Sequence, residues 1–420
     1  MSPVVRKVAV VGLGYIGLPT AAALASQGVE VRGVDIDPDT VRAVNRGEVR
    51  FVEPDLAGAV AGAVASGRLR ASQEVPVADA YVIAVPTPFK ADRQADLTFV
   101  RAVAEEIAPR LGPGTLVVLE STSPPGTTRQ VSRWLAELRP DLVFAHEGAR
   151  VVDVHVAYCP ERVLPGRIMV EIVTNDRVVG GLTPACAQRA AELYRTFTQG
   201  ALHLTDAESA EMTKLAENAY RDVNIAFANE LSLVSDQLGV DVWKVIELAN
   251  RHPRVQILAP GPGVGGHCVA VDPWFLVSSA PEHARLMRTA REVNDARPAH
   301  VVRQIVAAAR TRPGEPVACF GLAFKANIDD LRESPAVEVV QAVAAELTDV
   351  PVLVVEPHVR ELPASLAIHD QLRLVTAAEA LDQAGVLALL VDHDAFTAIE
   401  PARLAAAAVV DTRGRWRQRP

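Results

Sequence analysis

The hydrophobic pattern of the N-terminal segment "KVAVVGLGYIGLPTAAALASQGVEVRGVDID" is that of a strand, a glycine turn, a helix and a second strand. Its continuous apolar run "VAVV" is typical of a strand covered on both faces of a parallel sheet. The segments "DAYVIAVPTP" and "GTLVVLEST" have the same character, and each follows a helical stretch. This alternation predicts a doubly wound, Rossmann-like α/β domain over residues 1–204.

The pattern changes near residue 205. The stretch "TDAESAEMTKLAENAYRDVNIAFANELSLVSDQL" contains no glycine or proline, and its apolar residues recur at helical spacing. It predicts one long helix, capped by Thr205 or Asp206, at the start of a central helical domain over residues 205–310. Strand and helix patterns return in "VACFGLAF", "VPVLVVEP" and "AGVLALLVDH". The predicted fold class is therefore α/β, with two doubly wound Rossmann-like domains, 1–204 and 311–420, joined by the helical domain.

The composition is that of a globular chain and excludes some kinds of partner. The chain has 420 residues, of which 49% are hydrophobic and 22% charged. A formal net charge of −9 argues against a general nucleic-acid binder. The four cysteines are far apart and form no CxxC pair, so we expect no metal site and no disulfide scaffold. Without a signal-peptide pattern or a long apolar run, we expect a cytoplasmic protein with no membrane partner.

The glycine turn at the start of the chain has the spacing of a dinucleotide site. Gly12, Gly14 and Gly17 form GxGxxG directly after a strand and at the start of a helix. Asp35 ends the second strand, where a carboxylate would accept hydrogen bonds from ribose hydroxyls and repel a 2′-phosphate. This favours NAD over NADP. A purely structural turn and an FAD site remain open alternatives at this point.

Two further patterns offer chemistry but have plain alternatives. On the long helix, Lys214, Asn218 and Arg221 share one face, either as a solvated stripe or as donors aimed at a cleft. In "PGPGVGGHCVAVDPW", Cys268 follows a loop of glycines and prolines and precedes Asp272. The thiol could serve packing. It could also attack an aldehyde made by a first hydride transfer and so allow a second oxidation to an acid.

Long motifs resemble one enzyme family. They include "GLGYIGLPTA", "VPTP", "ESTSPPGTT", "CPERVLPG", "AEMTKLAENAYRDVNIAFANEL", "NRHPRV", "GPGVGGHCVAVDPWF" and "CFGLAFKANIDDLRESP". Together they are similar to the UDP-glucose/GDP-mannose dehydrogenase family, and most to its branch acting on UDP-N-acetyl-D-mannosamine. The resemblance implies NAD-dependent, four-electron oxidation of a UDP-sugar at C6 to a carboxylate. It also implies that residues 311–420 bind the UDP moiety.

The resemblance assigns roles to individual residues. It implies that Cys268 is the nucleophile, that Lys214 acts beside the reacting carbon and that Asp272 takes part in proton transfer. Asn218 joins this catalytic group, and Glu161 is matched to thioester hydrolysis, with a simple ion pair as its alternative. The residues implied to bind NAD are Gly12, Gly14, Tyr15, Ile16, Gly17, Asp35, Thr87, Thr128 and Arg332, with Thr122 as a hydroxyl near the chemistry. Those implied to bind the substrate are Arg162, Val163, Lys214, Asn218, Arg221, His252, Arg254, Gly265, Phe324 and Lys325.

Alternatives remain for the sugar and for the activity. A UDP-N-acetylglucosamine or UDP-glucose 6-dehydrogenase would share most of these motifs, although "RHPRV" and "GGHC" favour the mannosamine branch. A non-catalytic NAD and nucleotide-sugar sensor, or a two-electron oxidoreductase or epimerase, would give Cys268 no role. We interpret Cys159, Cys186 and Cys319 as packing residues. The resemblance further implies a homodimer or a larger even homo-oligomer through the long helix.

Overall fold

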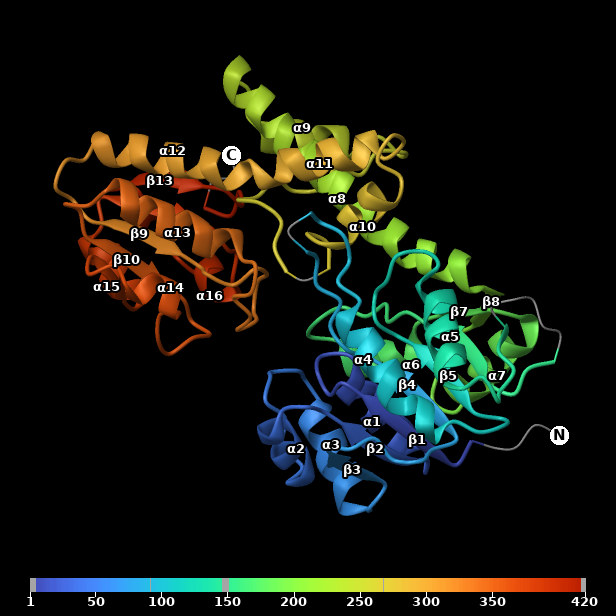
Figure 1. The fold of residues 1–420 in the computed structure, drawn as a ribbon. Coiled ribbons are helices and arrows are strands. Elements are labelled where there is room, and N and C mark those ends of the chain that lie inside the picture. Colours follow the sequence, from blue (N-terminus) through green and yellow to red (C-terminus); the bar gives the residue numbers. More distant parts are fainter. Residues whose placement is uncertain (1–4, 91, 146–150, 267, 417–420) are drawn as a thin grey trace. The chain divides into compact units, whose positions relative to one another are not determined.

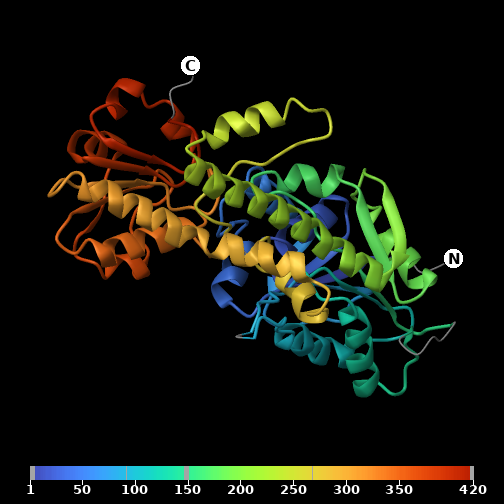
Figure 2. The ribbon, with the colours of Figure 1, turned by 90° about the horizontal axis from the view of Figure 1, so that it is seen from above.

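A computed structural model describes residues 5–90, 92–145, 151–266 and 268–416 (Figure 1). The chain divides into two units, Met1–Glu217 and Asn218–Pro420, each described here by itself. The division falls within one long helix, α8 (Ala207–Leu238), which runs unbroken in both ribbon views (Figure 2). Asp206 caps this helix by accepting a hydrogen bond from Ser209 N at 2.8 Å, as its sequence predicts. The three-domain division stays a prediction.

The first unit contains a sheet with the strand order β3-β2-β1-β4-β5-β6-β7-β8. All its neighbouring strands are parallel except β6 and β7. The strands are β1 (Lys7–Val11), β2 (Glu30–Val34), β3 (Leu69–Ser72), β4 (Ala80–Ile83), β5 (Leu116–Leu119), β6 (His155–Tyr158), β7 (Arg177–Gly181) and β8 (Leu202–Asp206). The connecting helices are α1 (Gly17–Ser26), α2 (Pro38–Asn45), α3 (Leu56–Ala65), α4 (Thr98–Ile107), the short 3₁₀ turn Ala108–Arg110, α5 (Thr127–Leu138), α6 (Ile168–Thr174) and α7 (Pro184–Tyr194).

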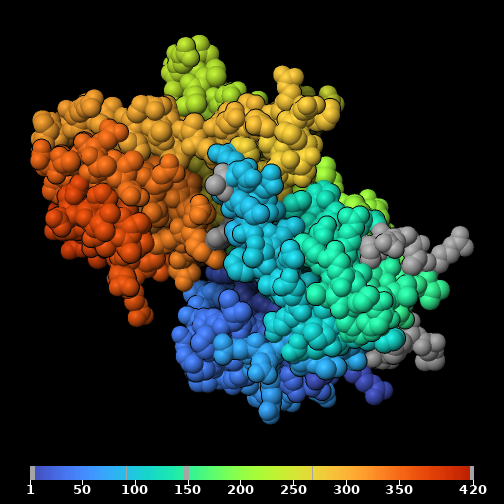
Figure 3. Space-filling model, in the orientation of Figure 1, coloured from blue at the N-terminus to red at the C-terminus, as the bar shows by residue number. Residues whose placement is uncertain are grey.

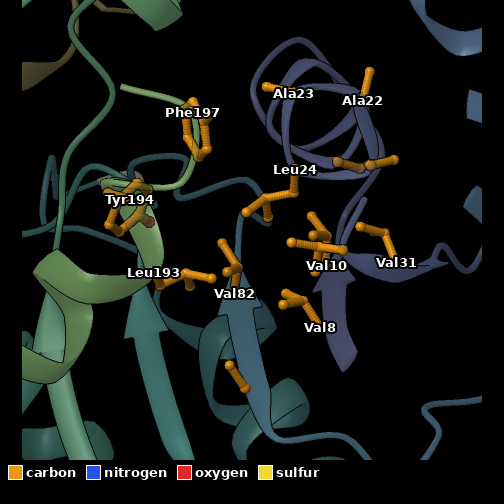
Figure 4. Packing of buried hydrophobic residues seen from close by; sticks show 14 of the residues in the cluster. Val8, Val10, Ala22, Ala23, Leu24, Val31, Val82, Leu193, Tyr194 and Phe197 are labelled. Atoms are coloured by element: carbon orange, nitrogen blue, oxygen red, sulfur yellow. The ribbon is translucent and has the colours of Figure 1, made fainter. Parts of the chain in front are cut away.

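Strand β1 explains the apolar run that opened the sequence. Val8 and Val10 pack on one face of the sheet, where Leu24 of α1 and Val82 of β4 surround them (Figure 4). Ala9 and Val11 belong to a second buried cluster on the opposite face. Because helices cover both faces, every position from Val8 to Val11 is apolar, and the prediction of a doubly wound domain is confirmed.

The second unit contains helices followed by a five-stranded parallel sheet with the order β11-β10-β9-β12-β13. Its strands are β9 (Val317–Phe320), β10 (Val352–Val355), β11 (Leu372–Leu374), β12 (Val386–Leu389) and β13 (Ala408–Asp411). Its helices after α8 are α9 (Val242–Ala249), α10 (Asp272–Ser279), α11 (Arg285–Asp295), α12 (Arg297–Arg310), α13 (Pro335–Glu346), α14 (Ala364–Ala367), α15 (Ala377–Gln383), α16 (Asp394–Thr397) and α17 (Pro401–Leu404). From α12 onward, the orange and red atoms pack into one continuous body (Figure 3).

Local sequence signals set several helix starts. Asp37, Thr183 and Ser334 each accept a hydrogen bond from a backbone N–H of the helix that follows. A proline occupies the first helical position in all three cases, where its fixed φ fits and its missing N–H costs nothing. No helix among the described residues is long and apolar enough to cross a membrane.

Candidate active site

The glycines of the first turn are required by its geometry. Gly12 has φ +94°, and a Cβ there would lie 2.5 Å from the carbonyl oxygen of Ala84. A Cβ at Gly17 would lie 1.8 Å from the carbonyl oxygen of Gly12, so the first turn of α1 could not close on the strand. A Cβ at Gly14 would meet nothing within 4 Å. The backbone is therefore open at Gly14, where a pyrophosphate approaches the start of α1.

Asp35 is held in one orientation by two backbone hydrogen bonds. Its Oδ2 accepts a hydrogen bond from Leu13 N and its Oδ1 one from Asp37 N, both at 2.9 Å. The residue is only partly buried, so each oxygen keeps a lone pair for a ribose hydroxyl. Tyr15 stacks on Phe51 with ring centroids 4.2 Å apart, and Ile16 directly precedes α1. The open turn and the fixed carboxylate fit NAD.

Two loops near the ends of β4 and β5 carry the predicted threonines. The Thr87 hydroxyl donates to the carbonyl oxygen of Thr122 at 2.6 Å, which brings these two residues together. Thr128 is fully buried, and its hydroxyl and backbone N–H donate to Glu211 of α8 at 2.6 and 2.7 Å. Gly126 N also donates to Glu211, at 2.6 Å. The Thr128 side chain is thus engaged within the protein, and its role toward NAD stays a prediction.

Glu211 is a residue that the sequence reasoning missed. Its carboxylate is fully buried at the N-terminus of α5, where the helix dipole favours an anion. Burial raises the pKa of Glu211 to about 7, against the hydrogen bonds from Thr128 and Gly126. A glutamate one turn before Lys214 on the predicted helix was the available signal. Its partners, however, lie about 80 residues away in sequence and follow only from the fold.

The "CPER" loop after β6 contains a buried acid. Glu161 is 9% exposed, and its Oε1 has no hydrogen-bond partner among the described residues. Burial raises the pKa of Glu161 to about 7, and the positive charges of Lys214 and Arg177 oppose that rise. An ionisable group with this pKa can accept and release a proton near neutral pH. Within the first unit, the structure therefore brings Glu161 and Lys214 into electrostatic contact.

The neighbours of Glu161 differ from the expectation of open substrate contacts. Arg162 forms an ion pair with Glu217 of α8, through two nitrogens and both carboxylate oxygens. Val163 packs against the buried cluster of β1 and α1. Both residues hold the loop in place, and their predicted contacts with substrate stay predictions.

In the second unit, Asn218 and Asp272 meet. Asn218 Nδ2 donates to Asp272 Oδ2 at 2.5 Å, and Asp272 is 2% exposed at the first position of α10. The Asp272 backbone N–H donates to the carbonyl oxygen of Cys268 at 2.8 Å. Cys268 is exposed, whereas Cys159, Cys186 and Cys319 are buried, as predicted for packing residues. The thiol loop, residues 260–266 and 268, thus ends four positions before the first residue of α10, which is an anchored carboxylate.

Close packing explains the glycines of the thiol loop. A Cβ at Gly265 would lie 2.4 Å from the carbonyl oxygen of Glu333 and 3.0 Å from Phe324 Cβ. A Cβ at Gly266 would lie 2.9 Å from the Phe324 ring, and Gly266 has φ +82°. The loop therefore lies against the segment "FKANIDDLRESP", and the structure brings together the predicted substrate residues Gly265 and Phe324.

Other predicted residues lie at the surface of the second unit. His252 and Arg254 are exposed neighbours, and His252 Nδ1 accepts a hydrogen bond from Arg254 N at 3.3 Å. Arg221 is exposed on α8, and Lys325 follows Phe324 on its loop. Arg332 forms a two-point ion pair with Asp330, at 2.6 and 2.8 Å, so its guanidinium is partly engaged. That these residues bind the substrate or NAD stays a prediction.

The chain matches three successive domains of one family. The NAD binding domain of the UDP-glucose/GDP-mannose dehydrogenase family matches residues 6–198, its central domain residues 208–296 and its UDP binding domain residues 318–418. These ranges contain the glycine turn at residues 12–17, nearly all of the long helix and the thiol loop.

Known proteins are similar to the chain over almost its whole length. It is 56% identical to the NDP-N-acetyl-D-galactosaminuronic acid dehydrogenase of Ralstonia solanacearum, covering 98% of this chain and 96% of that protein. It is 54% identical to the UDP-N-acetyl-D-mannosamine dehydrogenase of Escherichia coli, covering 98% of this chain and 99% of that protein.

Solved structures agree with these matches. The UDP-D-ManNAc dehydrogenase of Pyrococcus horikoshii has a TM-score of 0.86 at 35% identity, over 99% of this chain and 97% of that one. With three domains matched in order and a turn whose geometry fits NAD, the chain belongs to the UDP-glucose/GDP-mannose dehydrogenase family and is an NAD-dependent UDP-sugar dehydrogenase.

Proposed function

We propose that this enzyme oxidises C6 of UDP-N-acetyl-D-mannosamine to a carboxylate, with two NAD consumed for each sugar and a covalent intermediate on Cys268. The sugar is supported by the name of the Escherichia coli relative and by the motifs "RHPRV" and "GGHC". The observation that carries the mechanism is the exposed thiol of Cys268, on a glycine loop that leads into the anchored Asp272.

The thiol allows one site to perform both oxidations. Bound NAD supplies the acceptor for the hydride that leaves C6 in each oxidation. The first oxidation leaves an aldehyde, to which the Cys268 thiolate adds; a C–S bond forms, and the carbonyl oxygen takes a proton that Lys214 donates. The resulting thiohemiacetal loses a hydride and its hydroxyl proton and becomes a thioester. Water then adds to the thioester carbon, the C–S bond breaks, and the thiolate and the carboxylate product separate.

Glu161 and Asp272 are the proposed proton acceptors for the hydrolysis. Glu161 has an unpaired buried oxygen and a pKa raised by burial to about 7, which suits a base that takes a proton from water. Asp272 is oriented by Asn218, and we propose that it exchanges a proton with Lys214. A Glu161→Gln variant should keep the first oxidation and slow release of the acid.

Donors from the second unit are proposed to bind the nucleotide sugar. The exposed side chains of Arg221, His252 and Arg254, and the half-buried Lys325, offer cationic or neutral donors for the diphosphate and the acetamido group. Phe324 packs against Gly265 and Gly266 of the thiol loop. Arg162, Val163 and Arg332 keep their proposed roles toward substrate and cofactor alongside the internal contacts described above.

A second substrate has its own support. The Ralstonia solanacearum relative, at 56% identity, is named for an N-acetyl-D-galactosaminuronic acid, which differs from the mannosamine product at C2 and C4. The two candidate substrates are distinguished by their kcat/KM values. These should be measured for UDP-N-acetyl-D-mannosamine, UDP-N-acetyl-D-galactosamine, UDP-N-acetyl-D-glucosamine and UDP-glucose. At least about tenfold preference for the mannosamine sugar is expected, since one wrongly placed hydroxyl leaves polar groups unpaired. A higher value for the galactosamine sugar would reassign the substrate.

We also propose a homodimer through α8. One face of this helix carries apolar residues at intervals of three or four, many of them exposed. Tyr220, Phe227 and Leu238 are 74%, 56% and 69% exposed. Such a face is costly in water and suits a second copy of the same helix. The residues of this face are Met212, Ala216, Tyr220, Val223, Phe227, Leu231, Val234 and Leu238. Phe227→Glu should give a monomer by light scattering, and a monomeric parent protein would contradict the proposal.

The thiol is tested directly by two variants. Cys268→Ala should form no acid while its NAD affinity stays within about twofold, because the glycine turn that fits NAD is unchanged. Cys268→Ser should accumulate a slowly hydrolysed adduct, detectable as a mass increase on the peptide that contains residue 268. Acid formation by Cys268→Ala at the rate of the parent enzyme would exclude the thiol from the mechanism.

A further inference from the structure

Gly261, seven residues before Cys268, is held on both sides of its backbone. Its N–H donates to Asn229 Oδ1 at 2.9 Å, and its carbonyl oxygen accepts from Arg297 Nε at 2.9 Å. A Cβ at Gly261 would lie 2.6 Å from Arg413 Nη1, so the backbone is enclosed there. Farther along the thiol loop, Gly263 and Gly266 have positive φ values of 147° and 82°. Gly261 is therefore a fixed point from which a permissive backbone leads to the thiol.

Asn229 belongs to a buried line of polar side chains between α8 and α11. Asn229 Nδ2 donates to Asn294 Oδ1 at 2.9 Å, and Asn294 Nδ2 donates to Asp222 Oδ1 at 2.8 Å. Arg291 Nη1 donates to the same Asp222 oxygen at 2.6 Å. These four side chains are at most 2% exposed, so each of their hydrogen bonds is made away from water.

The hydrogen bonds along this line all have their donors on the same side, and the ion pair at one end sets that direction. Asp222, paired with the Arg291 cation, can only accept, so Asn294 must turn its Nδ2 toward Asp222 and its Oδ1 toward Asn229. Asn229 must then turn its own Nδ2 toward Asn294, and its Oδ1 is left for Gly261 N. The orientation of the Asn229 amide, which could otherwise flip, is thus fixed by an ion pair two side chains away.

We propose that Asn229 is a positioning residue for Cys268, and that the line from Arg291 to Gly261 sets the place of the thiol loop. This rests on the proposed function, in which Cys268 is the nucleophile. A loop anchored at Gly261 and packed on Phe324 keeps the thiol at one place through two oxidations and a hydrolysis. A looser anchor would let the loop keep its fold while the thiol misses the aldehyde.

The direction of the line gives a reversal experiment. Asn229→Asp places a carboxylate oxygen against Asn294 Oδ1, two acceptors with no proton between them. We expect kcat for acid formation to fall about 30-fold or more, with the KM for UDP-sugar and for NAD within about threefold, since a misplacement of about 1 Å costs about 100-fold in rate.

The double variant Asp222→Asn/Asn229→Asp should recover much of the loss. Asn294 can then flip, so that its Nδ2 donates to residue 229 and its Oδ1 accepts from the new amide at 222. Each side-chain donor between residues 222, 294 and 229 is reversed, the 3.1 Å hydrogen bond from Asn294 Nδ2 to the Asp222 carbonyl oxygen is lost, and Gly261 N still meets an acceptor. We expect kcat within about tenfold of the parent enzyme, although Arg291 then keeps only Asp295 as a carboxylate partner. Recovery of this kind is not expected if Asn229 serves stability alone.

Alkylation of Cys268 by iodoacetamide reads the position of the thiol without catalysis. The other three cysteines are buried, so the rate and its pH profile report on Cys268. The rate should change about fivefold or more in Asn229→Asp and return in the double variant. Asn224→Asp, the same substitution on α8 at an amide that donates to the Tyr220 carbonyl oxygen, is the matched control and should match the parent. If Asn229→Asp does not fold, Asn229→Ser shortens the side chain and so removes the links to both Asn294 and Gly261 without adding charge.

Three outcomes decide the proposal. Loss in Asn229→Asp and recovery in the double variant, in both kcat and alkylation, support it. Parent-like kcat and alkylation in Asn229→Asp, or a double variant no better than the worse single variant, overturn it. A parent enzyme that forms no acid overturns the proposed function instead, and the alkylation rates still decide whether Asn229 positions the thiol.

Discussion

The two sheets of this protein begin with the same turn, and the second turn lacks the features that fit NAD. Gly12 and Gly321 have φ values of 94° and 96°. Gly12 N donates to Val34 O, and Gly321 N donates to Val355 O, both at 2.8 Å. The next residue donates its N–H to a carboxylate at the end of the neighbouring strand, Leu13 to Asp35 at 2.9 Å and Leu322 to Glu356 at 2.7 Å.

The difference lies in what else each carboxylate accepts. Asp35 accepts one hydrogen bond on each oxygen and is partly exposed. Glu356 is 5% exposed, and its Oε2 is also approached by Ala323 N at 3.1 Å and His393 Nε2 at 3.0 Å. His393 Nδ1 accepts from Asn327 N, so Nε2 carries the proton and the ring has no lone pair left for a metal ion. Glu356 Oε2 is thus saturated by the protein itself, and Oε1 accepts from His358 N at 3.0 Å, so this buried carboxylate is less open to a ribose than Asp35.

The helix that follows also differs. In "GLGYIG", α1 begins at Gly17, so its N-terminus faces the turn. The second turn reads "GLAFKA", and α13 begins only at Pro335, after the segment that packs on the thiol loop. The comparison shows that the turn alone does not make a dinucleotide site. An open carboxylate and an immediate helix N-terminus are needed as well.

The largest effect is expected from the third glycine. Gly17→Ala puts a Cβ 1.8 Å from a carbonyl oxygen and must move the strand or the helix, which costs about 1–3 kcal/mol of folding free energy. The NAD Kd should rise about 100-fold, because the phosphate then meets a displaced helix start. The matched change Ala326→Gly should leave the Kd for UDP within about twofold. Calorimetric titrations with NAD and UDP measure both. An unchanged NAD Kd in Gly17→Ala would break the comparison.

A crossed pair of carboxylate variants is expected to have the next largest effect. Asp35→Asn should raise the NAD Kd about tenfold and reduce the preference for NAD over NADP. It should cost little stability, because the Asp35 carboxylate is partly exposed. Glu356→Gln should lower the free energy of unfolding by about 1–3 kcal/mol, because an amide N–H would face buried donors, with the NAD Kd unchanged. Denaturant unfolding and NAD titration of both variants form the test. Equal effects on both quantities would remove the distinction between the turns.

The smallest effect concerns acid stability. Burial alone would raise the pKa of Glu356, but the hydrogen bonds from His393, Leu322 N and His358 N outweigh it and hold that pKa below its usual value. A depressed carboxyl pKa contributes stability above the unfolded-state pKa, about 4.3, and the contribution is lost as pH falls through the folded-state pKa. His393→Ala removes one of these donors, so its acid unfolding midpoint should lie at higher pH than that of the parent. Circular dichroism between about pH 2 and 6 measures it. An unshifted midpoint would deny the histidine this role.

The elements of the fold could be predicted because their signals are local. The run "VAVV", the glycine turn and the unbroken helical stretch after Asp206 each specify their structure within a few turns of chain. The identity of the second sheet as Rossmann-like was also predictable. The difference between its turn and the first turn could have been noticed in "GLAFKA", where two of the three glycines are replaced.

The partners of polar side chains could not be predicted in the same way. Thr128 donates to Glu211, Arg162 pairs with Glu217, and Asn229 binds the backbone of Gly261, each across more than 30 residues of sequence. A hydrogen bond needs its partner within about 3 Å, which hydrophobic periodicity does not specify. The glycine loop left packing and chemistry open for Cys268, and only the family resemblance favoured chemistry; the close approach of Phe324 explains the glycines at 265 and 266.

The central claim is that the thiol of Cys268 carries the sugar through the second oxidation. Its most direct test is the number of NADH formed per UDP-N-acetyl-D-mannosamine consumed, with the product identified by mass spectrometry in the same samples. The account predicts two NADH and a uronate for the parent enzyme, and no uronate for Cys268→Ala. One NADH with a free aldehyde from the parent enzyme, or two NADH with uronate from Cys268→Ala, would contradict it.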